Sequence, residues 1–115
     1  MSFKNQTEQL AGNKTVEFIY PVHEIDSFNG EELKNHISAL ENVSAVVINF
    51  SDITYLNSSG LRELLQILKI LKENDILFFL TEVSADINKI FVHTNLNKLF
   101  TIVDTDQDVR NIVIG

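Results

Sequence analysis

The sequence predicts a small α/β fold, with a mixed, mostly parallel sheet of four to five strands and about four helices. A continuous apolar run at 45–48 is typical of a buried strand, and leucines recur at helical spacing across 58–73. Strand, helix and strand joined by short links favour a right-handed crossover and parallel pairing. The 115 residues are enough for one core, so the chain 1–115 is predicted to form a single domain.

The N-terminal region predicts a β-hairpin. Residues 3–10 are polar with weak alternation and are expected to form an edge strand, and turn-forming residues follow at 11–14. Apolar side chains alternate over 16–20, which indicates a second strand paired with the first. Pro21 is expected to end this strand, because proline cannot donate to a sheet ladder.

Helix-capping signals divide the middle of the chain. Residues 24–27 are expected to form a polar loop, and Asn29 with Glu32 has the spacing of a capping box, which predicts a first helix over about 30–41. The second helix is predicted over about 58–73. Its Ile67 and Ile70 are expected to pack on a neighbouring helix, and a partner surface is the alternative for them.

The C-terminal third predicts two more strands and two more helices. A strand is expected at 76–80, followed by a helix that opens at Ser84 or Ala85 and ends at Asn95, since Asn tolerates the left-handed conformation. A last short strand is expected at 101–103. Thr105 and Asp108 then have the spacing of a helix start.

Composition narrows the class of function. The formal net charge is −7, with nine Lys and Arg residues that form no cluster, which disfavours direct nucleic-acid binding. The acidic surface either steers the protein toward a basic partner or serves solubility alone. The chain has no cysteine, no apolar stretch over 1–10 and no apolar run long enough for a membrane span. A soluble cytoplasmic protein is therefore expected.

The sequence shows no catalytic or metal-binding constellation. The three histidines lie on separate predicted elements without metal-ligand spacing; His36 and His93 are expected to be exposed helix residues. His23 could reach Ser58, but such a pair would lack an orienting acid. Phosphate-binding glycine loops and a nucleophile elbow are absent from the sequence. We therefore predict no enzyme activity, no metal and no cofactor.

A polar turn at the start of the second helix is the best candidate site. Asn57, Ser58 and Ser59 precede Gly60, where the first backbone N–H groups of the helix have no partner. These residues can cap the helix, and the same position favours an added anion. The two serines are thus either caps or a phosphate-accepting switch, and the acidic loop at 24–26 is expected at the same sheet edge.

At this turn the sequence resembles a known family. The segment 49–61, which reads NFSDITYLNSSGL, resembles the signature of STAS domains, and most of all that of the bacterial anti-sigma factor antagonists. The segment 24–26 matches the family's loop before its first helix, and 90–100 matches a late apolar pattern in spacing. The resemblance implies a STAS-like single domain over most of the chain.

The resemblance also implies a function. In the antagonists, the serine at the position of Ser58 is phosphorylated by a partner anti-sigma factor, which is an ATP-dependent serine kinase. The unmodified protein binds that kinase and displaces a sigma factor, and a PP2C-type phosphatase removes the phosphate. We expect the partner contact patch to comprise Asp26, Asn57, Ser58, Ser59, Leu61 and Arg62.

Three positions depart from the family pattern. Asn57 stands where the antagonists usually carry Asp, and His23 and Asn95 each replace a Gly. Some STAS domains act without phosphorylation, as scaffolds or as regulatory parts of transporters and stress-sensing complexes, and the Asn57 change favours this alternative.

Overall fold

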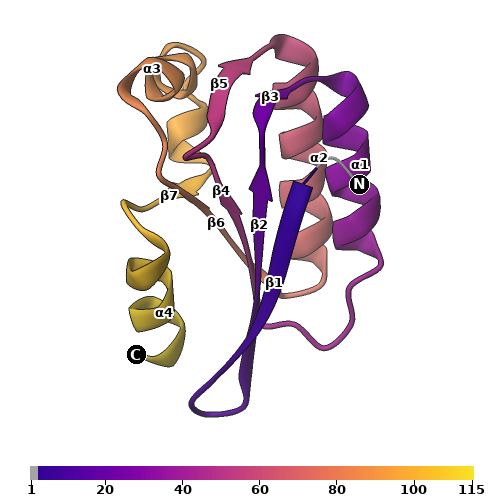
Figure 1. Ribbon diagram of the computed structural model, residues 1–115, viewed down its shortest axis with the longest axis vertical. Helices are drawn as coiled ribbons and strands as arrows, with labels where there is room; N and C mark the ends of the chain where they lie inside the picture. The colour runs from indigo at the N-terminus through magenta and orange to yellow at the C-terminus, as the bar shows by residue number, and fades with distance from the viewer. Residues whose placement is uncertain (1–2) are drawn as a thin grey trace.

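The computed structural model describes residues 3–115 and contains a five-stranded mixed sheet in the order β1-β2-β4-β6-β7 (Figure 1). β1 pairs antiparallel with β2, as the hairpin prediction requires, and every other pair in this sheet is parallel. The predicted α/β class is therefore confirmed. The strands are β1 (Phe3–Leu10), β2 (Lys14–Pro21), β4 (Ala45–Asn49), β6 (Leu77–Thr81) and β7 (Thr101–Ile102).

A second, two-stranded parallel sheet joins β3 (His23–Ile25) to β5 (Ile53–Leu56). The expectation of a polar loop at 24–27 is wrong except at Asp26, because residues 24 and 25 belong to β3 and Ser27 begins the first helix. Ile25 is fully buried, and the backbone of β3 pairs with β5 instead of water. The stretch after β4 likewise turns at 51–52 and continues as a separate strand.

Helices cover both faces of the main sheet. They are α1 (Ser27–Ser38), α2 (Ser58–Glu73), α3 (Ala85–His93) and α4 (Asp106–Ile114), with a short 3-10 turn η1 (Leu96–Lys98). Figure 1 shows α1 and α2 side by side across the sheet from α4. The second helix has the predicted bounds, and Ile67 is fully buried in the core beneath it.

The first helix begins three residues earlier than predicted. Its N-cap is Asp26, whose Oδ1 accepts from the N–H groups of Phe28 at 2.9 Å and Asn29 at 3.0 Å. Asn29 completes the capping box from the third helical position, because its Oδ1 accepts from the Asp26 N–H at 2.7 Å. Both residues are good caps, and the β3 strand decides between them by placing Asp26 where the extended backbone ends.

The other caps follow the sequence signals closely. Ser84 caps α3, and Thr105 forms a capping box with Asp108 at the start of α4. Asn95 adopts the expected left-handed conformation, with φ of 60°, but it follows the C-cap Thr94 and does not cap the helix itself. The short polar side chain of Asn makes this conformation accessible.

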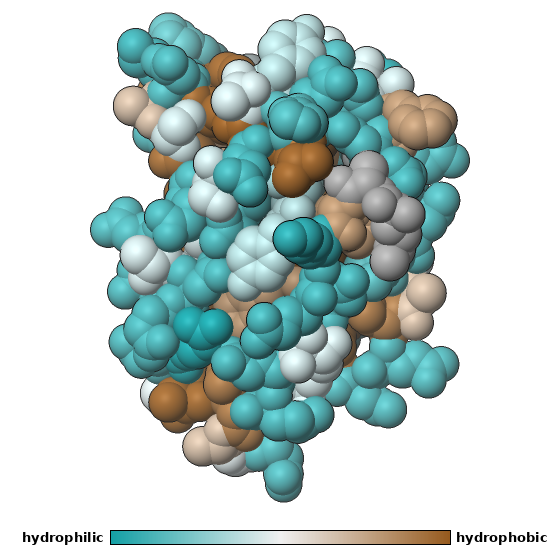
Figure 2. Space-filling model, viewed as in Figure 1, coloured by the Kyte–Doolittle hydropathy of each residue, from teal (hydrophilic) through white to brown (hydrophobic). Residues whose placement is uncertain are grey.

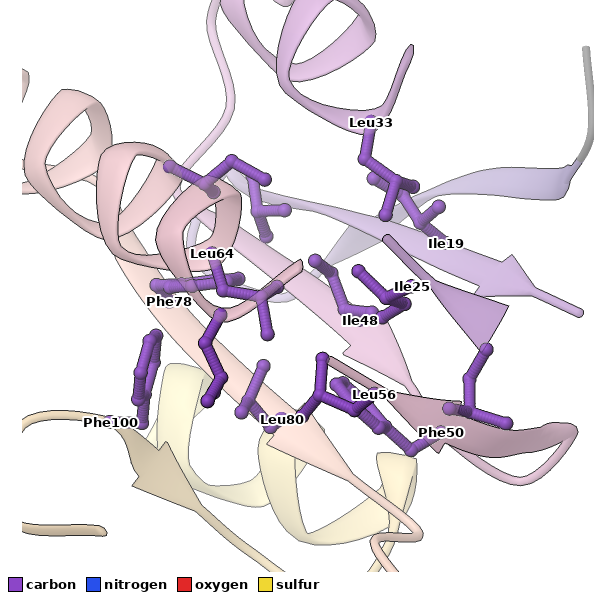
Figure 3. Packing of buried hydrophobic residues seen from close by; sticks show 14 of the residues in the cluster. Ile19, Ile25, Leu33, Ile48, Phe50, Leu56, Leu64, Phe78, Leu80 and Phe100 are labelled. Atoms are coloured by element: carbon purple, nitrogen blue, oxygen red, sulfur yellow. The ribbon is translucent and has the colours of Figure 1, made fainter. Parts of the chain in front are cut away.

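Two hydrophobic clusters hold the layers together. In the larger one, Leu33 of α1 and Leu64 of α2 lie over Ile19 and Ile48 of the sheet, as Figure 3 shows. Ile87 and Phe91 of α3 belong to the same cluster. Each buried side chain of this size contributes about 1.5–3 kcal/mol. The smaller cluster packs α4 on the opposite face and comprises Val16, Phe18, Ala45, Val47, Phe79, Val109 and Val113.

A polar network fastens the start of α4 to the sheet. The Asp106 carboxylate accepts from Thr81 Oγ1 at 2.6 Å, from Tyr20 Oη at 3.0 Å and from Asn49 Nδ2 at 3.1 Å. Burial, together with the hydrogen bond to Asp106, raises the pKa of Tyr20 to about 12. Asn49 and Thr81 are buried polar residues, and this carboxylate accepts from the donor group of each side chain.

His36 is not the exposed helix residue that the sequence predicts. Its Nε2 lies 2.8 Å from Oε2 of Glu17, which is fully buried in β2, and its ring contacts Phe3 edge-on. Glu17 also accepts from Thr7 Oγ1 at 2.5 Å and Asn5 Nδ2 at 2.8 Å. Burial raises the pKa of Glu17, but the hydrogen bonds from Thr7, His36 and Asn5 outweigh it and hold the pKa below its usual value.

This carboxylate predicts a specific dependence of stability on pH. Because the pKa of Glu17 is lower in the folded chain than in the unfolded one, its contribution is present above the unfolded value of 4.5 and is lost as pH falls below it. Glu17→Gln should cost about 1–3 kcal/mol at neutral pH and flatten the acid side of the stability profile. Urea denaturation between pH 3 and pH 7 measures this, with the exposed Glu73→Gln as control. An unchanged acid limb in Glu17→Gln would contradict the assignment.

Candidate functional site

The pairing of β3 with β5 brings two helix starts to one edge of the molecule. Ile25 lies opposite Leu56 in this parallel pair, and the next residue on each strand, Asp26 or Asn57, is the N-cap of the following helix. Figure 1 shows α1 and α2 beginning at the same end of the fold. Two helix N-termini therefore present their positive dipole ends on one surface.

Glycines allow the two helices to approach this closely. A Cβ added at Gly60 would lie 2.0 Å from the carbonyl oxygen of Ile25, so no side chain fits there. A Cβ at Gly30 would lie 2.8 Å from the Cβ of Glu63 across the helix pair. Just beyond this contact, Lys34 Nζ of α1 lies 3.1 Å from Glu63 Oε2 of α2. The relative placement of Asp26 and Ser58 is thus fixed by backbone contact.

Ser58 occupies the first position of α2 and is exposed to solvent. Asn57 caps the helix, with its Oδ1 2.8 Å from the Gly60 N–H and its carbonyl 3.0 Å from the Leu61 N–H. The cap thus comes from Asn57, and neither serine is needed for it. The first N–H groups of a helix have no intrahelical partner, which makes this position favourable for an anion on the Ser58 hydroxyl.

The structure separates the six predicted patch residues into two groups. Ser58 and Arg62 are exposed, and Asp26, Asn57 and Ser59 are partly exposed at the same edge. Leu61 is only 8% exposed and packs in the larger core cluster, so its side chain offers little surface to a partner.

His23 lies away from Ser58. It is opposite Ile53 at the start of the two-stranded sheet, whereas Ser58 follows the other end of β5, about 10 Å of strand further on. Its backbone N–H donates to the Asp52 carbonyl at 2.8 Å, with φ of 68°. A Ser58–His23 pair is therefore not formed. Since Gly is the usual residue at positive φ, the structure also gives a reason for the family's Gly at this position.

Two exposed aromatic side chains, neither predicted from the sequence to belong to the site, add apolar area near this edge. Phe28, in the first turn of α1, is 77% exposed, and Tyr55, paired with Glu24, is 53% exposed. Phe28 does not fall on the buried stripe of α1 that contains Leu33 and Ile37. This position off the stripe is the one sequence signal that indicates an exposed Phe28. Exposed aromatic residues are enriched at protein interfaces.

The described part of the chain gives no support for a metal site or a membrane-spanning helix. Over residues 3–115, no three His, Asp or Glu side chains group closely enough to hold a metal ion. No helix in this range is both long and apolar enough to cross a membrane. The distinctive feature that remains is the serine at the helix start.

Comparison with known proteins identifies the family. The family model for the STAS domain matches residues 9–109, so the chain belongs to the STAS domain family. This is a non-enzymatic regulatory family.

Solved structures share the fold at low sequence identity. TM1081 from Thermotoga maritima superposes with a TM-score of 0.81 at 18% identity, covering 96% of this chain and 95% of that one. The unphosphorylated anti-sigma factor antagonist SpoIIAA gives 0.70 at 21%, covering 97% and 99%, and its phosphorylated form gives 0.67 at 19%, covering 95% and 99%. A sulfate transporter family protein from Wolinella succinogenes gives 0.74 at 11%, covering 86% and 87%.

The close approach at Gly60 predicts a large effect of one methyl group. Gly60→Ala should lower the free energy of unfolding by about 3 kcal/mol, because the obstructing atom is a backbone oxygen that cannot rotate away. Gly30→Ala is the comparison: its Cβ would lie 2.8 Å from the Cβ of Glu63, which is fixed to the backbone of α2. It should therefore also destabilise the fold, but less than Gly60→Ala, because the overlap is smaller and Ala favours the helix by about 1 kcal/mol. Chemical denaturation of both variants compares them. A Gly60→Ala protein as stable as Gly30→Ala would refute the contact.

Proposed function

We propose that this protein is an anti-sigma factor antagonist that acts by partner switching, with Ser58 as the phosphorylated residue. The unmodified form binds an anti-sigma factor serine kinase and so releases a sigma factor. Phosphorylation of Ser58 ends this binding, and a PP2C-type phosphatase restores it. The observation that carries the proposal is an exposed Ser58 at the first position of α2, within the family's turn and beside the start of α1.

The chain itself tolerates the added charge. A phosphate at Ser58 carries about −1.5 to −2 charge and meets unpaired N–H groups and the helix dipole. Arg62 lies four residues further along α2 and is also exposed, so it is on the same side as Ser58. The switch therefore acts on the partner, through repulsion and the cost of burying the phosphate, while this domain stays folded.

Asn57 fits the same proposal. Its side chain makes the capping hydrogen bond to Gly60 without a carboxylate charge. A phosphate on the next residue is then repelled less than it would be beside an Asp cap. Asp26 remains the one acidic cap at this edge, and it is held by the N–H groups of α1.

Charge substitutions at Ser58 test the switch. Ser58→Glu should weaken binding to the cognate anti-sigma factor kinase at least about tenfold, through uncompensated charge in the interface, and Ser58→Ala should retain it. Calorimetric titration in the presence of ADP measures both. Ser51→Glu, in the exposed turn before β5, is the control for added charge alone. Equal binding by wild type, Ser58→Ala and Ser58→Glu would eliminate the switch.

A second candidate is a phosphorylation-independent STAS scaffold, or a regulatory subunit of a transporter or stress-sensing complex. The neutral cap Asn57 and the likeness to the sulfate transporter family protein favour it. This candidate requires that wild type and Ser58→Glu capture the same partners, without a kinase among them.

A further inference from the structure

The helices that follow β6 and β7 leave the sheet toward opposite faces. β6 and β7 are neighbours in the sheet, yet α3 packs in the larger cluster with α1 and α2, while α4 packs in the smaller cluster on the other face. Where adjacent parallel strands diverge in this way, a crevice opens at their carboxyl ends. A cavity of about 660 Å³ lies there, lined among others by Glu82, Val83, Asn88, Val103, Asp104 and Thr105.

A second hollow of about 500 Å³ continues this crevice along α4. It shares Ile102, Val103 and Asp104 with the first and adds Asp108 and Ile112. The two form one groove, which we call the β7–α4 groove. In Figure 2 the outline of the molecule steps inward on the side where Figure 1 places α3 and α4. An elongated, open groove suits an extended chain better than a compact molecule.

The groove combines negatively charged side chains with the apolar side chains of Ile102 and Val103, which line both hollows. Glu82 and Asp104 are exposed at its rim, and Asp108 lies further along it. Among the described residues that line either hollow, none is Lys, Arg or His. Ile112 remains 48% exposed at one end.

The groove also borders an open strand edge. Within residues 3–115, β7 pairs with β6 alone, so one side of its backbone has no strand beside it. Ile102 of β7 lines both hollows. An extended peptide can add main-chain hydrogen bonds at such an edge and place alternate side chains into the groove.

We propose that the β7–α4 groove binds an extended segment of a partner protein in which Lys or Arg alternates with apolar residues. The basic side chains pair with Glu82, Asp104 and Asp108, and the apolar ones cover Val103 and Ile112. The groove lies between α3 and α4 at the β7 side of the main sheet (Figure 1), and none of its lining residues belongs to β3, β5, α1 or α2. It is therefore a second contact surface that does not depend on phosphorylation of Ser58.

The test uses a capped synthetic peptide of alternating lysine and valine, with a glutamate–valine peptide for comparison, titrated into the labelled full-length chain by NMR. We expect the lysine peptide to shift amide signals over 82–88 and 101–112. The double variant Glu82→Gln with Asp104→Asn should bind about fivefold more weakly, as expected for two exposed ion pairs. Ile112→Ser should also weaken binding.

Matched controls separate the groove from general attraction to an acidic protein of net charge −7. Glu31→Gln with Glu73→Gln removes two exposed charges elsewhere, and Leu77→Ser changes a side chain that is 50% exposed, like Ile112, at the opposite end of β6. Neither should alter peptide binding, and Ser58→Glu should also leave it unchanged. Equal losses in groove and control variants, equal binding of the glutamate peptide, or shifts confined to α1 and α2 would overturn the proposal.

Discussion

The contact between the Ile25 carbonyl and Gly60 is the constraint on which the site depends. It holds the end of β3 against the first turn of α2, at a distance that leaves no room for a side chain. Through it, the caps Asp26 and Asn57 become neighbours, although they lie thirty-one positions apart in the chain. The exposed Ser58 is consequently presented on a rigid edge formed by two helix starts, and phosphorylation there would change the charge of a surface without moving it.

The β3–β5 pair is small, and it is stabilised by packing against the larger hydrophobic cluster. A two-stranded sheet is marginal in water on its own. Here Ile25 and Leu56 point into the large cluster with Ile48, Phe50 and Leu64, as Figure 3 shows. The same core that seats the leucine stripe of α2 therefore also fixes the residues before it. Core packing and site geometry cannot be varied independently at this edge.

The sequence predicts the parts of the fold in which local signals agree. For α2, the leucine stripe, the cap Asn57 and the polar face all indicate one helix, and its bounds are correct. The box of Thr105 and Asp108 is likewise local and likewise correct. The family turn around Ser58 makes the candidate site recognisable, because its residues are contiguous.

The incorrect predictions concern residues whose environment comes from distant parts of the chain. The three residues of β3 are too few to show a strand pattern, and their partners in β5 lie thirty or thirty-one positions away in the chain. By residue type, Asn29 and Asp26 are equally good N-caps for α1, and only the position of β3 shows that Asp26 is the cap. His36 has an exposed pattern on its helix, but it meets a buried Glu17 from the sheet. The β7–α4 groove arises only when β6 and β7 are neighbours and their helices diverge.

Phosphopeptide mass spectrometry of the native chain, isolated from its own cells during growth and under stress, tests directly whether Ser58 is a switch. We expect a phosphate on Ser58, in a fraction that changes between conditions, with Ser59 unmodified. A chain that stays unphosphorylated at Ser58 in every condition, while still held in a stable complex, would contradict the switch and leave this edge as a scaffold surface.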